Sequence, residues 1–152
     1  MELKQIASFA VDHTKLTPGI YLSRTDRGID TYDLRFKKPN ADDYLETPAM
    51  HTIEHLAATY LRSSEFSDNI IYFGPMGCRT GFYLLVIDMT AEQVIKAVQD
   101  TFRFISTYSG KIPGTDPIEC GNYLEHDLEG AVSEAKIYCE NIKNLEKQDI
   151  YY

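Results

Sequence analysis

The chain has 152 residues, enough for one domain with a sizeable core of its own. Its 15 Lys and Arg residues against 23 Asp and Glu residues give a formal net charge of -8, which argues against a sequence-independent nucleic-acid surface. No apolar run approaches the roughly 20 residues that span a bilayer, and the start of the chain lacks the apolar core of a secretory signal. Three cysteines are a sparse and odd set for a disulfide framework. We therefore expect one domain over residues 1–152, in the cytoplasm, without a nucleic-acid or membrane partner.

The first half of the chain predicts a hairpin followed by a helix. Residues 19–25 (GIYLSRT) and 29–36 (IDTYDLRF) alternate aromatic or branched residues with polar ones around the turn-prone DRG. Thr47 and Pro48 then supply an N-cap and a first-turn proline for a helix that runs to about Ser64.

Two further strands and a helix are expected next. Residues 69–73 (NIIYF) and 80–88 (TGFYLLVID) are typical of buried strands on either side of a turn, GPMGCR. Thr90 and Gln93 form a capping-box pattern, which predicts a helix from Ala91 to about Tyr108.

The last part of the chain begins as an irregular loop. Residues 111–122 (KIPGTDPIECGN) are rich in turn-forming residues and carry Cys120. Apolar residues then recur at helical spacing, which predicts a long helix from about Leu124 to Gln148. Strands mixed with helices in this order indicate an α+β fold.

The most informative motif is HTIEH, residues 51–55. On a helix, His51 and His55 project about 40° apart and about 6 Å along the axis, so both imidazoles can reach one ion. Glu54 lies at the rim of such a site, where it can serve as an acid/base group without being a ligand. The alternative is a polar helix flank with two hydrogen-bonded histidines, because so short a pattern also arises by chance.

The cysteines offer a third ligand and a nucleophile. Cys120, on its loop, can reach an ion held by the two histidines and leave a fourth position for water or substrate; otherwise it is a small buried hydrophobe. Cys78 lies in the GPMGCR turn, where Arg79 would favour a thiolate, although a lone cysteine between strands is more often buried. Cys139 lies on the apolar face of the last helix, and we assign it to the core.

Four other polar residues are ambiguous from the pattern alone. His126 could support the metal ligands or simply begin a helix. Arg35, at a strand end, could clamp a carboxylate, although most such arginines are solvated, and Ser8 and His13 carry no signal of their own. Spacing alone therefore predicts an open metal site with a thiol nearby.

Three separated stretches together resemble the S-ribosylhomocysteine lyase (LuxS) family: HTIEHLAATYLR, PMGCRTGFY and CGNYLEHDLEGA. SFAVDHT, and YDLRF followed by PN, match it in the same order, so the resemblance covers almost the entire chain. One departure lies near the thiol. The family commonly reads DISPMGC where this chain has YFGPMGC, so Tyr72 replaces an aspartate and Gly74 a serine.

The resemblance implies an α+β homodimer with an antiparallel sheet packed by helices, one of which carries the metal motif, and with active sites at the subunit interface. It implies that His51, His55 and Cys120 hold one Fe(II) per subunit, which Zn(II) can replace in purified protein. Glu54 and Cys78 match the acid/base pair of the family. Positions near the substrate match Ser8, His13, Arg35 and, more weakly, Arg62.

The activity implied by the resemblance is cleavage of S-ribosyl-L-homocysteine by successive carbonyl migrations and a β-elimination. The products would be L-homocysteine and 4,5-dihydroxy-2,3-pentanedione, the precursor of autoinducer-2, which connects the protein with quorum sensing and the activated methyl cycle. Two other functions stay open. An inverted-motif metallopeptidase would use Glu54 but not Cys78, and a closed structural metal site would add His126 or His13 as fourth ligand.

Overall fold

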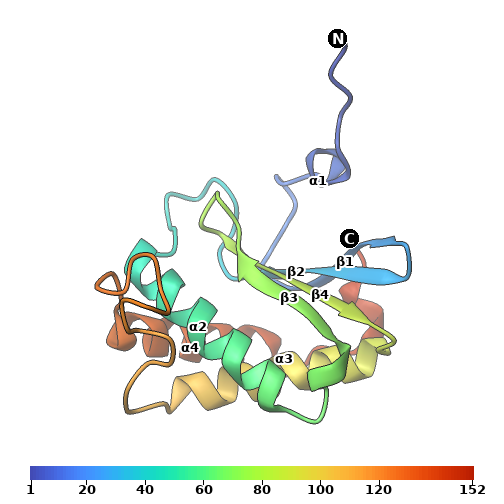
Figure 1. The fold of residues 1–152 in the computed structure, drawn as a ribbon. Helices are drawn as coiled ribbons and strands as arrows, with labels where there is room; N and C mark the ends of the chain where they lie inside the picture. The colour runs from blue at the N-terminus through green and yellow to red at the C-terminus, as the bar shows by residue number, and fades with distance from the viewer.

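A computed structural model describes residues 1–152 as a four-stranded antiparallel sheet with three long helices on one of its faces (Figure 1). The strand order is β1-β2-β4-β3. The strands are β1 (Gly19–Asp26), β2 (Ile29–Arg35), β3 (Ile70–Pro75) and β4 (Gly81–Ile87). The helices are α1 (Ala7–Ala10), α2 (Thr47–Ser63), α3 (Ala91–Ser106) and α4 (Leu128–Ile142), with short 3-10 turns η1 (Ser67–Asn69) and η2 (Lys147–Ile150). The expected α+β class, with an antiparallel sheet packed by helices, is confirmed.

The β1–β2 hairpin turns through two residues with positive φ. Arg27 has φ 54° and Gly28 has φ 84°, and Asp26 pairs directly with Ile29. Two consecutive left-handed residues in a two-residue loop match the twist of the strands that it joins. The turn expected at DRG is therefore present.

The core lies between the sheet and the helices. On β2, Tyr32 and Leu34 belong to the buried core cluster, together with Leu84 of β4 and Ile53 of α2. Because neighbouring residues of a strand point to opposite faces, Asp33 then lies on the face without helices. The sheet thus separates an apolar layer from a polar face.

The terminal helix is shorter than the sequence pattern predicted. Asp127 begins α4 by accepting a hydrogen bond from the Gly130 N–H over 2.9 Å, so residues 124–127 lie outside the helix. The backbone of Asp127 instead donates to the Thr52 hydroxyl of α2 over 2.9 Å. The helix ends at Ile142, and η2 follows after a turn.

Helix α1 was not predicted. It has four residues, none of them buried, and belongs to an N-terminal arm that projects from the helix-free face of the sheet (Figure 1). No helix in the structure is both long and apolar enough to cross a membrane.

Candidate metal centre and catalytic groups

Helix α2 presents His51 and His55 one turn apart, with ring centroids 4.7 Å from each other. His51 Nδ1 lies 2.8 Å from the Glu125 carbonyl oxygen, and His55 Nδ1 lies 2.8 Å from that of Pro113. A carbonyl oxygen only accepts, so each Nδ1 carries the proton and donates it. Both Nε2 atoms therefore present lone pairs, as metal-binding histidines do.

Gly114 allows the loop to approach His55 this closely. A Cβ at this position would lie 3.1 Å from His55 Nδ1, and the residue has φ 69°. Glycine adopts this left-handed conformation without strain. The Pro113 carbonyl can therefore reach the imidazole.

Cys120 brings its sulfur to the same two imidazoles. Its Sγ lies 3.5 Å from His51 Nε2 and 3.9 Å from His55 Nε2. A tetrahedral ion with bonds of about 2.0–2.1 Å to nitrogen and about 2.3 Å to sulfur would hold the N and S atoms about 3.5 Å apart. The three side chains thus fit a shared ion, and Cys120 is half-buried at the site instead of being part of the core.

His126 also belongs to this cluster. The sequence left its role undecided. Its ring stacks on His51 with centroids 4.0 Å apart, and the ligand atoms of His51, His55, Cys120 and His126 all lie within 4.8 Å of one another. The one sequence signal for it is its place six residues after Cys120 in the same loop. The sequence pattern does not predict how close His126 lies to the other three residues.

The protonation of His126 follows from its partner, Thr52. The Thr52 hydroxyl donates to the Pro48 carbonyl over 3.0 Å and accepts from the Asp127 N–H, so it has no proton left for His126 Nδ1 at 3.1 Å. His126 Nδ1 is therefore the donor, and the buried Nε2 carries a lone pair without a hydrogen-bond partner. Burial, and then repulsion from His51 and His55 in their protonated forms, lower the pKa of His126 to about 4, so the ring is neutral at pH 7.

Glu54 lies on α2 between the two histidines and is half-buried. It does not belong to the group of side chains that could hold an ion. A carboxylate at the rim of a metal site can exchange protons with a bound molecule. The acid/base role of Glu54 stays a prediction.

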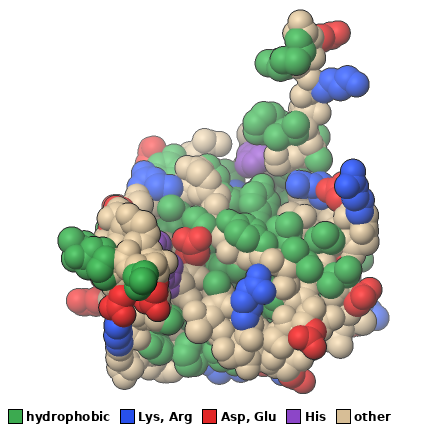
Figure 2. Space-filling view, in the orientation of Figure 1, with side chains coloured by type: hydrophobic (Ala, Val, Ile, Leu, Met, Phe, Trp, Pro, Cys, Tyr) green, Lys and Arg blue, Asp and Glu red, His purple; other side chains and the backbone are tan.

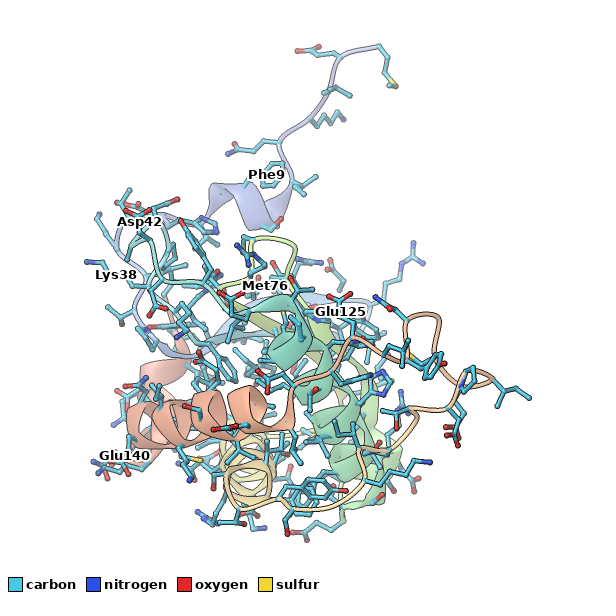
Figure 3. The ribbon with its side chains drawn as sticks, turned by 90° about the vertical axis from the view of Figure 1, so that its left-hand side faces the viewer. Phe9, Lys38, Asp42, Met76, Glu125 and Glu140 are labelled. Carbon is cyan, nitrogen blue, oxygen red and sulfur yellow. The ribbon has the colours of Figure 1, made fainter.

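Cys78 is exposed, so the interpretation of this residue as a buried core cysteine is wrong. It lies in a tight turn in which the Arg79 N–H donates to the Met76 carbonyl and Arg79 has φ 60°. The Leu45 N–H donates to the Arg79 carbonyl over 2.9 Å, which ties this turn to the segment just before α2 (Figure 3). The turn that carries Cys78 is thereby held near the N-terminal end of α2.

A buried arginine contacts Cys78 through a threonine. Arg35 Nη1 donates to Thr80 Oγ1 over 2.7 Å, and Thr80 Oγ1 lies 3.0 Å from Cys78 Sγ. Because the Thr80 oxygen accepts from Arg35, its hydroxyl hydrogen is free to point at the sulfur. The guanidinium of Arg79, in contrast, lies over the Tyr44 ring and donates to the Leu45 carbonyl.

Arg35 is only 2% exposed and forms an ion pair with Asp33. Burial opposes its charge, but Asp33 outweighs burial and raises the pKa of Arg35. Arg62 is exposed, and its Nη2 donates to the Ile71 carbonyl over 2.9 Å, which links α2 to β3. Substrate contacts by these two arginines stay predictions.

Ser8 and His13 lie on the N-terminal arm, outside the His–Cys cluster. Both are half-buried, and His13 Nδ1 is 2.8 Å from the Val11 carbonyl oxygen. His13 is therefore not the fourth member of a closed site within this chain.

The two positions that differ from the common family sequence near Cys78 are in steric contact with each other. Tyr72 and Gly74 lie two residues apart on the same face of β3, and a Cβ on Gly74 would lie 2.0 Å from the Tyr72 hydroxyl. The Tyr72 side chain thus occupies the space that a serine at position 74 would need. Position 74 pairs across the sheet with Tyr83.

Comparisons with known proteins show the family of this chain. The family model described as S-Ribosylhomocysteinase (LuxS) matches residues 6–149. The chain is 47% identical to S-ribosylhomocysteine lyase from Phocaeicola vulgatus, over 99% of this chain and 98% of the relative. It is 44% identical to that of Borreliella burgdorferi over 99% of both chains, and 42% identical to that of Porphyromonas gingivalis over 97% and 96%. The chain therefore belongs to the LuxS family of S-ribosylhomocysteinases.

Proposed function

We propose that this protein is a metal-dependent carbon–sulfur lyase that cleaves S-ribosyl-L-homocysteine to L-homocysteine and 4,5-dihydroxy-2,3-pentanedione. Family membership supports the activity, since the relatives bear the name of this lyase. The observation that carries the proposal is the convergence of two imidazole Nε2 atoms and one sulfur within 3.5–3.9 Å, on a helix that also carries Glu54. We further propose that the whole chain, residues 1–152, is the single lyase domain.

His51, His55 and Cys120 would hold the ion, which we propose to be Fe(II), with Zn(II) as its replacement in purified protein. An ion with this mixed nitrogen and sulfur set would supply Lewis-acid stabilisation of negative charge on the sugar oxygens. The residues fit this task before the ion arrives, because hydrogen bonds already fix both histidines in the required tautomer.

Cys78 and Glu54 would move the protons. The carbonyl of the sugar must migrate from C1 to C2 and then to C3 before the thioether at C5 can leave. Cys78, as thiolate, takes a proton from one carbon and returns it to the next in each migration. Glu54 moves protons among the oxygens and removes the C4 proton as homocysteine departs, while Ser8, His13, Arg35 and Arg62 contact the substrate.

The family resemblance supports a homodimer with active sites at the interface. Leu3, Ile6 and Phe9 have exposed side chains. Figure 2 shows hydrophobic side chains along the projecting arm. A second copy that covers the arm could bring Ser8 and His13 to a site. We also propose that the enzyme works in the cytoplasm, where its products serve quorum sensing or the activated methyl cycle.

The first experiment follows thiol release from S-ribosylhomocysteine by anaerobically purified protein loaded with Fe(II). We expect Cys78→Ser and Glu54→Gln to abolish turnover and to retain the metal, because neither residue is a ligand. His51→Ala and Cys120→Ala should lose both metal and turnover, because each removes one of three ligands. Metal content by plasma mass spectrometry and thiol release by colorimetry check both statements.

The control is Cys139→Ser, which removes a thiol on α4 outside the cluster and should leave metal and turnover unchanged. Full metal content in Cys120→Ala would contradict the ligand assignment. Thiol release that persists in Cys78→Ser would contradict the role of Cys78.

A closed structural metal site is the second candidate, because the bare, buried Nε2 of His126 could complete a four-ligand set. In that case metal removal would unfold the protein and no substrate would be turned over. Thiol release by metal-loaded protein decides against it.

A further inference from the structure

Tyr152, which follows η2 and is 51% exposed, lies against the helix-free face of the sheet. Its ring stacks on Tyr21 with centroids 5.1 Å apart, and its hydroxyl donates to Asp33 Oδ2 over 2.9 Å. Burial, and then the charge of Asp33, raise the pKa of Tyr152, so the hydroxyl keeps its proton at neutral pH. Figure 1 accordingly places this end of the chain beside β1 and β2. Tyr152 is thus a steady hydrogen-bond donor to Asp33.

Asp33 and Arg35 form a buried pair with few partners. Each is 2% exposed, and Asp33 Oδ1 and Arg35 Nε have no hydrogen-bond partner. The two donors to Asp33 are Arg35 and Tyr152, both at Oδ2. When some polar atoms of a buried ion pair lack hydrogen bonds, the geometry and stability of the pair depend strongly on the hydrogen bonds that remain. Loss of the Tyr152 hydroxyl should therefore disturb the pair.

This pair continues to Cys78 through Thr80. Arg35 Nη1 donates to Thr80 Oγ1 over 2.7 Å, and that oxygen lies 3.0 Å from Cys78 Sγ. We propose that Tyr152 is a positioning residue for Cys78: its hydroxyl holds Asp33, Asp33 orients Arg35, and Arg35 fixes the Thr80 hydroxyl against the thiol. The catalytic meaning of this chain of contacts rests on the proposed role of Cys78 in the lyase.

Two further ionisable residues, Arg79 and Tyr83, belong to the turn and the strand that follow Cys78. Burial, then Asp33, raise the pKa of Tyr83 on β4, so this residue stays neutral. Arg79 directs its guanidinium at Tyr44 and Leu45. Arg35 and Asp33 therefore form the charged pair linked to the thiol, and Tyr152 offsets part of the negative charge of Asp33. Without that hydroxyl, Asp33 opposes a thiolate at Cys78 more strongly.

The test compares Tyr152→Phe with Tyr151→Phe. The first keeps the ring stacked on Tyr21 and removes only the hydroxyl, and the second removes the hydroxyl of the neighbouring tyrosine, which is also exposed. The metal-loaded proteins react with iodoacetamide from about pH 6 to about pH 10, and mass spectrometry of the Cys78 peptide gives the rate. We expect Tyr152→Phe to react about threefold more slowly at neutral pH and as fast as wild type at high pH, where the thiolate is fully formed.

Thr80→Val serves as the positive control, since it removes the hydroxyl next to the sulfur, and Tyr151→Phe should match wild type. A Tyr152→Phe profile that superimposes on wild type would overturn the proposal, whether or not Thr80→Val shifts the profile. Equal slowing at every pH would overturn it too, because that result indicates altered access. Thermal unfolding checks that each variant is folded.

Alkylation needs no substrate, so this result stands apart from the lyase assay. If thiol release fails but the profile shifts, Tyr152 still positions Cys78, and only the proposed reaction is lost. If the lyase is active, Tyr152→Phe should lower kcat with little change in KM, because the Tyr152 hydroxyl donates to Asp33, which is not a proposed substrate residue.

Discussion

At the scale of single residues, hydrogen bonds decide what the histidines of the site can do. Carbonyl oxygens of Glu125 and Pro113 fix the tautomers of His51 and His55, and the Thr52 hydroxyl does the same for His126. Each Nε2 is left as a lone pair in a small region. Preorganised ligands lose little freedom when an ion binds, and the partners that orient them matter almost as much as the ligands themselves. The site is therefore ready for metal in the folded chain.

These partners also explain which site residues the sequence could predict. The spacing of His51 and His55 on a helix fixed their proximity, because helix geometry is regular. His126 and the Thr80 contact depend on tertiary placement across loops, for which the sequence has no local period. For Arg35 the sequence left open a carboxylate clamp or a solvated strand-end residue, and the structure buries it against the carboxylate of Asp33.

The replacement pair at β3 yields a prediction about residue coupling. Gly74→Ser should destabilise the protein by about 1–2 kcal/mol, because a Cβ there would lie 2.0 Å from the Tyr72 hydroxyl and the ring must swing away. In the Tyr72→Asp background the same change should cost about 1 kcal/mol less, since the obstacle is gone. Urea unfolding of the two single variants and the double variant measures this coupling. Additive effects would mean that the two positions are independent.

At the scale of elements, the sequence predicts the start of a helix correctly where the hydrogen bonds at that start join residues close in sequence. The capping box at Thr90 and Gln93 is present, with the Gln93 N–H donating to Thr90 Oγ1 over 3.2 Å and the Thr90 N–H donating to Gln93 Oε1 over 2.8 Å. The start of α3 was therefore predicted correctly. The start of α4 was not, because Asp127 serves two elements at once: its side chain caps α4 and its backbone binds Thr52. The helical spacing of apolar residues extends N-terminal to Leu128, but hydrogen bonds to Asp127 and from it set the start of α4 there.

The α3 cap gives a prediction at this scale. Thr90→Ala should lower the free energy of unfolding by about 1 kcal/mol, because it leaves the Gln93 N–H without its partner at the helix start. Glu46→Ala is the matched control, since Glu46 precedes α2 in the same position but its side chain caps nothing. We expect the control to change stability by less than about 0.5 kcal/mol. The urea midpoint should fall for Thr90→Ala with an unchanged slope, and equal losses in both variants would contradict the capping argument.

At the scale of the whole molecule, the sheet has one face that packs against the helices and one polar face. The helix-side face is filled by apolar residues, and the other face carries Asp33 and Arg35 on one strand. Alternation along the strands predicted two different faces from sequence. It could not predict that Tyr152, some 119 positions further along the chain than Asp33, would lie against the polar one. Such long-range contacts follow from topology, not from any local pattern.

The N-terminal arm gives the last prediction, which concerns assembly. Leu3, Ile6 and Phe9 are 84%, 54% and 72% exposed, and α1 has no buried residue. Ordering such a segment costs conformational entropy that the chain does not offset with burial of its own, so we expect a second copy to cover it. Sedimentation should give a mass of twice the 17.4 kDa of one chain.

Ile6→Asp with Phe9→Asp should weaken the dimer at least tenfold, because burying two charges in an apolar interface is unfavourable. Ile137→Asp, on the exposed side of α4, should leave the mass unchanged. A monomeric wild type would contradict the dimer, and a dimer untouched by the double variant would place its interface away from the arm.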